Sequence, residues 1–228
     1  MKILVIDTSS KAASTALFVD NALLGSCIVN TTVTHSQKLM PLVHTVLEQT
    51  QTPVRDIDAF YVCEGPGSFT GVRIGIATAI GMAQPAKKDL YTFSSMFLLA
   101  CAVKHIEGYV VSVIDAKRED VYYGVYRWRE GRLEILEEGV EALSTLMDML
   151  SDKYREASLY WVGDALHVYP EVVSSNMTAH PNWHVGSISE SVPKADQLCL
   201  ASVAAARKTD VFHVKANYMR KSQAERDL

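Results

Sequence analysis

The sequence lacks the features that would place the protein in a membrane or, by itself, on a nucleic acid. No apolar run approaches the roughly 18 residues that a membrane helix requires, and Asp7 interrupts the N-terminal run Ile3–Ile6. Basic residues are not in excess, because 22 Lys and Arg stand against 26 Asp and Glu, for a net charge of −4. We therefore expect no secretory signal and no membrane span, and we expect any nucleic-acid contact to be local or made by a partner.

The sequence also lacks paired cysteines. Its four cysteines, Cys27, Cys63, Cys101 and Cys199, are scattered singly, and none belongs to a CxxC pair of the kind found in zinc ribbons and redox motifs. We expect them to be small, mostly buried thiols of a protein in the reducing cytoplasm, with no metal bound.

The composition is that of an ordinary globular protein. Hydrophobic residues make up 48% of the 228 positions and charged residues 21%, which is enough apolar material for a substantial core. The length fits one large domain or two small ones. Intrinsic disorder is excluded as the main state.

One order of elements occurs twice along the chain. The apolar run Lys2–Asp7 ends in a carboxylate and is followed by a polar turn and two further strand-like segments. The run Tyr109–Asp115 also ends in Ile-Asp, and the turn Ala116–Glu119 and two more strands follow it. We therefore predict a duplicated α/β fold with two subdomains, 1–104 and 105–228, each with a mixed sheet flanked by helices.

Helical spacing of apolar residues predicts the remaining elements. A capping box at Thr34 begins the first helix, and we expect Pro85 to end the second. The expected helices cover residues 34–47, 72–83, 95–103, 144–150 and 195–208, and residues 176–183 have the composition of a loop.

The most distinctive motif of the sequence is a glycine-rich turn, Gly65–Gly71. A turn between a strand and a helix can bind phosphate through free backbone N–H groups. The spacing fits neither common phosphate motif: Val72-Arg73 follows Gly71 where a Walker loop has Lys-Ser/Thr, and Thr70 stands where a Rossmann fingerprint has its third glycine. A tight turn followed by a closely packed helix is the favoured interpretation.

The helix after this turn carries small residues at four-residue spacing, which allow another backbone to come close. An interior glycine costs about 1 kcal/mol relative to alanine, so close packing is the expected compensation. Packing within the chain is the default explanation of these small residues. Packing against a helix of a partner protein is the more specific alternative, because the preceding apolar helix has hydrophobic residues on more than one face. The candidate partner-binding residues are Leu39, Met40, Leu42, Val43, Val46, Gly71, Gly75, Ala79 and Met82.

The repeated strand–Asp–turn pattern resembles the actin, Hsp70 and sugar-kinase architecture, whose members bind ATP between two halves. Both turns here lack the glycine that admits phosphate, so the pattern indicates a retained fold with an eroded ATPase site. Gly163-Asp164 resembles an adenosine-contacting pair. The residues of a residual nucleotide or anion site would be Asp7, Thr8, Ser9, Asp115, Lys117 and Arg118.

Other catalytic constellations are weaker. The chain has no G-x-S-x-G segment, since Phe69-Thr70 follows Ser68. His180 and His184 have helical metal-ligand spacing but lie in a segment of turn composition, and His35 and Ser36 are adjacent, a spacing that rarely lets two side chains meet. We expect no catalytic residues, no metal and no cofactor.

Four segments together resemble the bacterial TsaB (YeaZ) family. They are ILVIDTS at residues 3–9, His35-Ser36 leading into Leu39-Met40-Pro41, GPGSFTGVRIG at residues 65–75, and DAKREDVY at residues 115–122. A weaker match follows at Gly163-Asp164 and in the tail, where Ala216-Asn217 replaces the family's proline before Tyr218.

This resemblance implies a bacterial tRNA-modification role. In that family's system TsaC makes threonylcarbamoyl-AMP, and TsaD transfers the threonylcarbamoyl group to adenosine 37 of tRNA with TsaB as its non-catalytic partner. The ATPase TsaE binds the complex, and TsaB alone can form a homodimer. TsaD holds a metal through H-x-x-x-H, whereas the matching stretch here, Phe93–Leu98, has no histidine. The family's TsaB–TsaD contact uses N-terminal helices, which map onto the two helices considered above.

Three functional hypotheses therefore remain to be compared with the structure. The first is a scaffold subunit that binds TsaD, helps to recruit TsaE and contacts tRNA only through the complex. The second is a nucleotide-binding, kinase-like ATPase. The third is a protease, for which the sequence offers no convincing nucleophile and base.

Overall fold

A computed structural model describes residues 1–104, 106–198, 206–210, 213–217 and 219. The chain divides into two compact units, Met1–Leu98 with Pro193–Asn217, and Leu99–Val192 with Tyr218–Leu228. Each unit contains one mixed sheet and one hydrophobic core, and each is described by itself.

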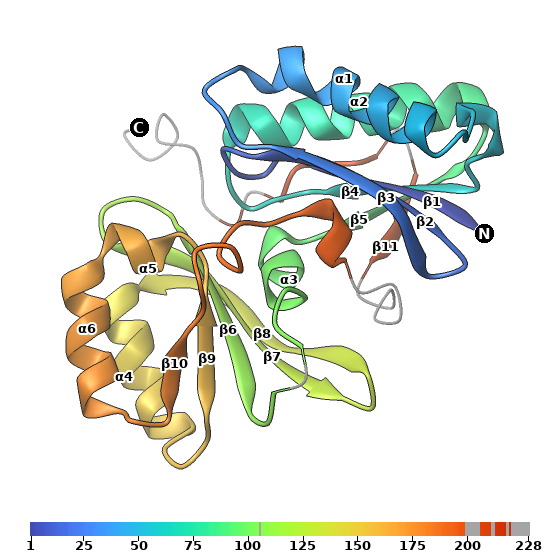
Figure 1. Cartoon of the computed structure of the whole chain (residues 1–228). Coiled ribbons are helices and arrows are strands. Elements are labelled where there is room, and N and C mark those ends of the chain that lie inside the picture. Colours follow the sequence, from blue (N-terminus) through green and yellow to red (C-terminus); the bar gives the residue numbers. More distant parts are fainter. Residues whose placement is uncertain (105, 199–205, 211–212, 218, 220–228) are drawn as a thin grey trace. The chain divides into compact units, whose positions relative to one another are not determined.

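The first unit is built on a six-stranded sheet in the order β11-β5-β4-β1-β2-β3. Helices α1 and α2 pack against each other and cover one face of the sheet (Figure 1). The elements are β1 (Lys2–Asp7), β2 (Ala13–Val19), β3 (Ala22–Val29), α1 (His35–Gln49), η1 (Val54–Asp56), β4 (Ala59–Cys63), α2 (Phe69–Ala86), β5 (Asp89–Phe93), η2 (Ala195–Gln197) and β11 (Arg207–Thr209). Helix α3 (Ser95–Ala100) begins in this unit and ends in the second.

The second unit is built on a five-stranded sheet in the order β10-β9-β6-β7-β8. Helix α4 packs against β8 and α6, and α5 packs against β6 (Figure 1). The elements are β6 (Tyr109–Asp115), β7 (Asp120–Arg129), β8 (Arg132–Ala142), α4 (Leu143–Lys153), β9 (Leu159–Val162), α5 (Ala165–Val168), α6 (Pro170–Ala179) and β10 (Trp183–Val185).

The two sheets share the arrangement of five strands, and β11 is an addition to the first, which confirms the predicted duplicated α/β fold. In each, the first strand pairs antiparallel with the second and parallel with the fourth. Even the irregularities correspond: the second and third strands shift register between Leu17 and Phe18 in one sheet and between Val125 and Tyr126 in the other. The hairpin turns between these strands, Asp20-Asn21 and Glu130-Gly131, both have positive φ angles.

The strands that begin the two halves are deeply buried. β1 is solvent-inaccessible from Ile3 onward, and β6 is buried over Val110–Ile114. In the first unit, α1 and α2 pack onto the sheet through residues such as Leu39, Val43, Val72 and Ile76. This packing fixes the carboxyl ends of β1 and β4 beneath the first turn of α2.

Three sequence predictions of local structure were wrong. Helix α2 continues past Pro85 to Ala86, where Lys87 caps it with a φ of +53°. A proline in the last turn removes one backbone hydrogen bond and leaves the rest of the helix intact, so it did not end the helix early. The expected loop at 176–183 contains the end of α6 and the start of β10.

The third error concerns the expected helix over 195–208. Residues 195–197 form the 3-10 helix η2, Arg207–Thr209 form strand β11, and 199–205 lie outside the described residues, as does Cys199. β11 pairs antiparallel with β5, and Arg207 donates to the buried Glu64 at 2.6 Å. Residues 193–217 thus belong with the first unit. The division of the sequence at residue 104 stays a prediction.

Candidate functional site

The turn after β1 is a closed hydrogen-bonded unit. Ser9 donates to Asp7 Oδ1 through its backbone N–H at 3.2 Å and through its hydroxyl at 2.7 Å. Thr8 Oγ1 donates to the carbonyl of Gly71 in α2 at 2.7 Å. Asp7, Thr8 and Ser9 are all buried. Both hydroxyls that the sequence offered for a residual anion site are therefore engaged in intrachain hydrogen bonds.

The glycine-rich turn makes room for this β1 turn. A Cβ added to Gly67 would lie 2.1 Å from the carbonyl oxygen of Ser9, and one added to Gly71 would lie 2.2 Å from that of Thr8. One turn further along α2, a Cβ on Gly75 would lie 2.4 Å from Thr8 Oγ1. The prediction of a tight turn and a closely packed helix is confirmed.

The backbone N–H groups at the start of α2 are largely satisfied by the protein itself. Ser68 donates its N–H to the carbonyl of Ser9 at 2.7 Å, and the Ser68 hydroxyl accepts from the N–H of Gly71 at 3.2 Å. The backbone of the β1 turn thus packs directly against the glycine-rich turn and the first turn of α2.

Asp7 is electrostatically unusual. Its Oδ2 atom has no hydrogen-bond partner, and burial raises the pKa of its carboxyl group from 3.8 to about 6, against the lowering effect of the hydrogen bonds from Ser9. The Cys63 thiol lies beside it, and burial raises the pKa of that thiol as well. With a pKa of about 6 this carboxyl group is mostly ionised at pH 7, and it is its complete burial that makes it a poor ligand for a magnesium–nucleotide complex.

The corresponding carboxylate in the second unit has the opposite environment. Asp115 Oδ1 accepts from the N–H of Lys117 at 2.8 Å and from the Tyr169 hydroxyl at 2.9 Å, and Oδ2 accepts from Lys117 Nζ. Burial raises the pKa of Asp115, but these bonds from Lys117 and Tyr169 outweigh it and leave the pKa below its ordinary value. Asp115 is thus a stable carboxylate already paired within its own unit.

The turn after Asp115 is strained. Lys117, Arg118 and Glu119 have φ angles of +69°, +59° and +67°, a conformation that non-glycine residues rarely adopt. The Tyr169 hydroxyl accepts the N–H of Glu119 at 3.1 Å and so holds this turn to the segment between α5 and α6. Tyr169 was missed by sequence reasoning, because a lone tyrosine between two helices forms no motif.

Gly163-Asp164 is explained by packing and by a hydrogen bond to the end of β6. Gly163 has a φ of +125°, and a Cβ there would lie 1.9 Å from the Val113 carbonyl oxygen. Asp164 Oδ1 accepts the N–H of Asp115 at 3.0 Å, and burial raises the pKa of Asp164. These two residues connect the ends of β6 and β9.

Most of the predicted partner-binding residues lie inside the first unit. Leu39, Leu42, Val43 and Val46 are buried, and only Met40, at 50% exposure, clearly faces solvent. Gly71, Gly75 and Ala79 are buried too, and Met82 is partly buried. The small residues of α2 allow the protein's own β1 turn to approach the helix closely. A partner role for these residues stays a prediction.

The outer face of α2 was missed by the sequence analysis. Phe69 is 48% exposed, and the Arg73 guanidinium lies 3.7 Å from the centre of its ring. Ala77 and Gly81 continue this exposed face, and a Cβ on Gly81 would meet no atom within 4 Å. Gly81 therefore has no packing explanation within the described residues.

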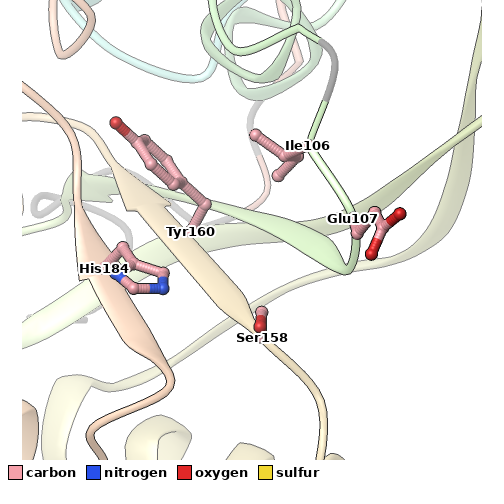
Figure 2. Close-up of a pocket in the computed structure, with 5 residues that line it drawn as sticks. All are labelled: Ile106, Glu107, Ser158, Tyr160 and His184. Carbon is pink, nitrogen blue, oxygen red and sulfur yellow. The ribbon is translucent and has the colours of Figure 1, made fainter.

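An open cavity of about 360 Å³ lies in the second unit and is lined by Ile106, Glu107, Ser158, Tyr160 and His184 (Figure 2). Figure 2 shows Tyr160 and His184 on the neighbouring strands β9 and β10, and their rings are 6.3 Å apart. Glu107 and Ser158 place this cavity at the amino ends of β6 and β9, whereas ligands of α/β sheets bind at carboxyl ends. It contains none of the predicted site residues.

The histidine pair of the sequence analysis does not form a metal site. The His180 ring stacks on Trp183 with a centroid distance of 4.3 Å, while His184 lines the cavity on β10. Within the described part of the chain, His, Cys, Asp and Glu side chains nowhere gather in threes that could hold a metal ion. The helices of that part include none long and apolar enough to cross a bilayer.

Comparison with known proteins decides the family. The model of the family described as "TsaD: tRNA N6-adenosine threonylcarbamoyltransferase" matches residues 30–227. The tRNA threonylcarbamoyladenosine biosynthesis protein TsaB of Escherichia coli is 32% identical over 179 residues, 75% of each chain. The chain belongs to the TsaB family. Bacillus subtilis TsaB is 27% identical over 226 residues, which are 99% of this TsaB-family chain and 96% of that protein.

Solved structures agree with this assignment. YeaZ from Pseudomonas aeruginosa superposes with a TM-score of 0.79 at 26% identity and covers 95% of this TsaB-family chain and 99% of its own. The ethanolamine utilization protein EutJ from Carboxydothermus hydrogenoformans, at 12% identity and a TM-score of 0.50, covers 81% of this chain and 84% of its own and shares the fold alone.

Two glycines of α2 should respond in opposite ways to alanine. Gly81→Ala should raise the free energy of unfolding by up to about 1 kcal/mol, because it adds helix propensity in open space. Gly75→Ala should lower it by about 1–3 kcal/mol, because its Cβ would overlap Thr8 Oγ1. Urea denaturation should be followed by circular dichroism, since Trp128, Trp161 and Trp183 all lie in the second unit. Equal effects at the two positions would contradict the packing described here.

The two aspartates should give opposite pH dependences of stability. Because the folded-state pKa of Asp7 lies above its unfolded value, the free energy of unfolding should fall as pH rises from 3.8 to about 6. Asp7→Asn removes this contribution, so the free energy of unfolding of the variant minus that of the native chain should rise by about 3 kcal/mol across the window. Denaturation curves at a series of pH values test this.

Asp115→Asn is the matched control. The pKa of Asp115 is lowered, so its stabilisation is present above its unfolded pKa and is lost as pH falls below it. The same free-energy difference, variant minus native, should therefore decrease as pH rises, and should do so at lower pH than for Asp7→Asn. A flat difference for Asp7→Asn between pH 3.8 and about 6 would show that Asp7 is not a buried, proton-binding group.

Proposed function

We propose that this chain is a non-catalytic subunit in the biosynthesis of threonylcarbamoyladenosine on tRNA, acting as the partner of a TsaD-type transferase. Its family membership supports the pathway, because the E. coli and B. subtilis relatives are named tRNA threonylcarbamoyladenosine biosynthesis proteins. The observation that carries the non-catalytic role is the close packing of the β1 turn, in which the backbone of Thr8 and Ser9 packs against Gly67 and Gly71.

The two aspartate turns support this role in different ways. The first turn buries Asp7 and engages the hydroxyls of Thr8 and Ser9 within the chain. The second pairs Asp115 with Lys117 and Tyr169. To hold a nucleotide between these carboxylates, the protein would have to break its own hydrogen bonds at both sites, each worth about 0.5–1.5 kcal/mol or more for charged partners.

The kinase-like and protease alternatives have less support. For the kinase-like alternative, the hydroxyls of Thr8 and Ser9 are already engaged in hydrogen bonds within the chain. A protease would need a base beside a nucleophile, although one Pseudomonas aeruginosa structure of similar fold is described as a protein with similarity to peptidase YEAZ. Here the Ser36 hydroxyl lies 3.2 Å from Thr34 Oγ1, while His35 Nδ1 is buried without a hydrogen-bond partner. This geometry does not favour a His35–Ser36 pair.

The outer face of α2, with Met40 on α1, is the surface that we assign to the transferase partner. It combines an exposed aromatic ring, Phe69, under the Arg73 guanidinium with the small residues Ala77 and Gly81. Small residues allow a partner helix to approach closely, and aromatic and Arg side chains are enriched at interface hot spots. A TsaE-type ATPase would join the assembled complex, and tRNA would be bound through the complex, consistent with the net charge of −4.

The proposal predicts that Gly81→Arg weakens transferase binding at least about tenfold while the chain stays folded, because the new side chain would stand where the partner helix packs. Binding to the TsaD-type protein of the same organism should be measured by calorimetry. Met149→Arg, at a similarly exposed apolar residue on α4 (46%), is the matched control and should bind normally.

A reconstituted modification assay tests the non-catalytic role. With TsaC-, TsaD- and TsaE-type proteins and tRNA, threonylcarbamoylation should require this chain, and Gly81→Arg should lose modification in parallel with binding. Folded Asp7→Asn and Asp115→Asn variants should retain most of the activity. If either aspartate variant abolishes modification while it binds TsaD normally, the chain carries a working catalytic site and the proposal is wrong.

A further inference from the structure

The cavity of the second unit lies on the face of the sheet opposite to its helices. Side chains alternate between the two faces along a strand. Leu159 and Trp161 of β9 and Trp183 of β10 belong to the hydrophobic core, together with residues of α4, α5 and α6. Tyr160 and His184 are partners in the register of β9 and β10, so they point to the opposite face. There they line the cavity of about 360 Å³.

The lining combines aromatic, aliphatic and acidic groups. The rings of Tyr160 and His184 have centroids 6.3 Å apart and planes inclined at 37°. Figure 2 shows Ile106 and Glu107 on the segment that leads into β6, and Ser158 at the start of β9. Among the described residues that line the cavity there is neither a lysine nor an arginine.

The acidic character of the cavity is not neutralised within the described part of the chain. No described residue forms an ion pair or hydrogen bond with the Glu107 carboxylate, the Ser158 hydroxyl or the His184 ring nitrogens. A second carboxylate, that of Glu190, lies close to Tyr160: burial and then this neighbouring charge raise the pKa of the Tyr160 hydroxyl. A hollow lined by one sign of charge attracts ligands of the opposite sign.

The duplication provides an internal comparison for this end of the sheet. In the first sheet β5 occupies the position that β10 has in the second, beside the fourth strand of the repeat. There β11 pairs with the outer edge of β5, and Lys208 donates to Asp89 at the amino end of β5 at 2.7 Å. In the second sheet no described strand pairs with the outer edge of β10. The amino end that carries an ion pair in one unit therefore carries an unpaired carboxylate and an open cavity in the other.

We propose that this cavity binds a small organic ammonium ion with an apolar body. The Glu107 carboxylate supplies the opposite charge, and the face of the Tyr160 ring attracts a cation through its π-electrons. The Ser158 hydroxyl can accept an ammonium N–H, and Ile106 can contact the apolar body. An anion would meet an unpaired carboxylate, and a neutral ligand would cover that carboxylate without replacing its hydration.

The position and size of the cavity define the site further. Its volume of about 360 Å³ lies near the lower end of the range for small-molecule sites, so the ligand is small. The cavity lies at the amino ends of β6 and β9, whereas α/β folds hold nucleotides at the carboxyl ends of their strands. The site is therefore separate from the aspartate turns, and it does not depend on the proposed transferase partnership.

Three probes of one shape test the class of ligand. The full chain, labelled with ¹⁵N, should be titrated with benzylamine, benzyl alcohol and benzoate, which are cationic, neutral and anionic, and followed by NMR. Benzylamine should shift the amide signals of Glu107, Tyr160 and His184 in a saturable way, whereas the other two probes should bind at least about tenfold more weakly. The absence of saturable shifts with benzylamine up to about 10 mM would overturn the proposal, as would equal binding of benzoate or benzyl alcohol.

Two charge-matched variants test the residue that carries the site. Glu107→Gln keeps the shape of an exposed side chain and removes its charge, so it should weaken benzylamine binding about tenfold or more while the circular dichroism spectrum stays native. Glu171→Gln is the control, because Glu171 is an exposed acid in the first turn of α6, the helix that packs through Val173 into the core on the other side of the sheet. It should bind benzylamine like the native chain. Equal weakening in both variants would show a general attraction to an acidic protein, and the proposed site would be wrong.

Discussion

The close packing of the β1 turn against α2 is the contact on which the first unit depends. The carbonyl oxygens of Thr8 and Ser9 lie where the side chains of Gly71 and Gly67 would begin, and no larger residue fits at either position. The contact brings α2 down onto β1 and β4 and so creates the core that contains Val62, Val72 and Ile76. It also buries Asp7 and determines which face of α2 is left for solvent.

The duplication shows how one framework can hold the same residue in two electrostatic states. Asp7 and Asp115 end equivalent strands, but one is enclosed by the turn and the helix above it, and the other is held by Lys117 and Tyr169. Burial without a counter-ion raises a carboxyl pKa, whereas several donors lower it. The two positions are therefore equivalent in topology and opposite in proton affinity, so neither can be interpreted from its place in the fold alone.

Much of the framework follows from the sequence. Lys2–Asp7 and Tyr109–Asp115 are read directly as buried strands ending in aspartate, and the glycine spacing predicts a close approach. The short elements could not be predicted from the sequence, because three residues such as Trp183–Val185 are too few to show a hydrophobic periodicity. The sequence also could not show which helix faces are exposed to solvent. Leu39, Val43 and Gly75 share helical faces in the sequence, but spacing cannot tell whether a face meets the protein's own sheet or another molecule. That distinction depends on tertiary packing, and here the glycine face meets Thr8.

Two exposed features of the first unit differ in their chemistry. The outer face of α2 offers an aromatic ring, a guanidinium and two small residues, while β3 offers a neutral edge. These lie on different elements, so one does not preclude use of the other. In the second unit the corresponding edge carries glutamates, and Asp115 is neutralised within the turn by Lys117. Charge therefore discourages strand pairing on β8, where the same topology would otherwise permit it. The placement of charge thus differs between the corresponding edges of a duplicated framework without any change in fold.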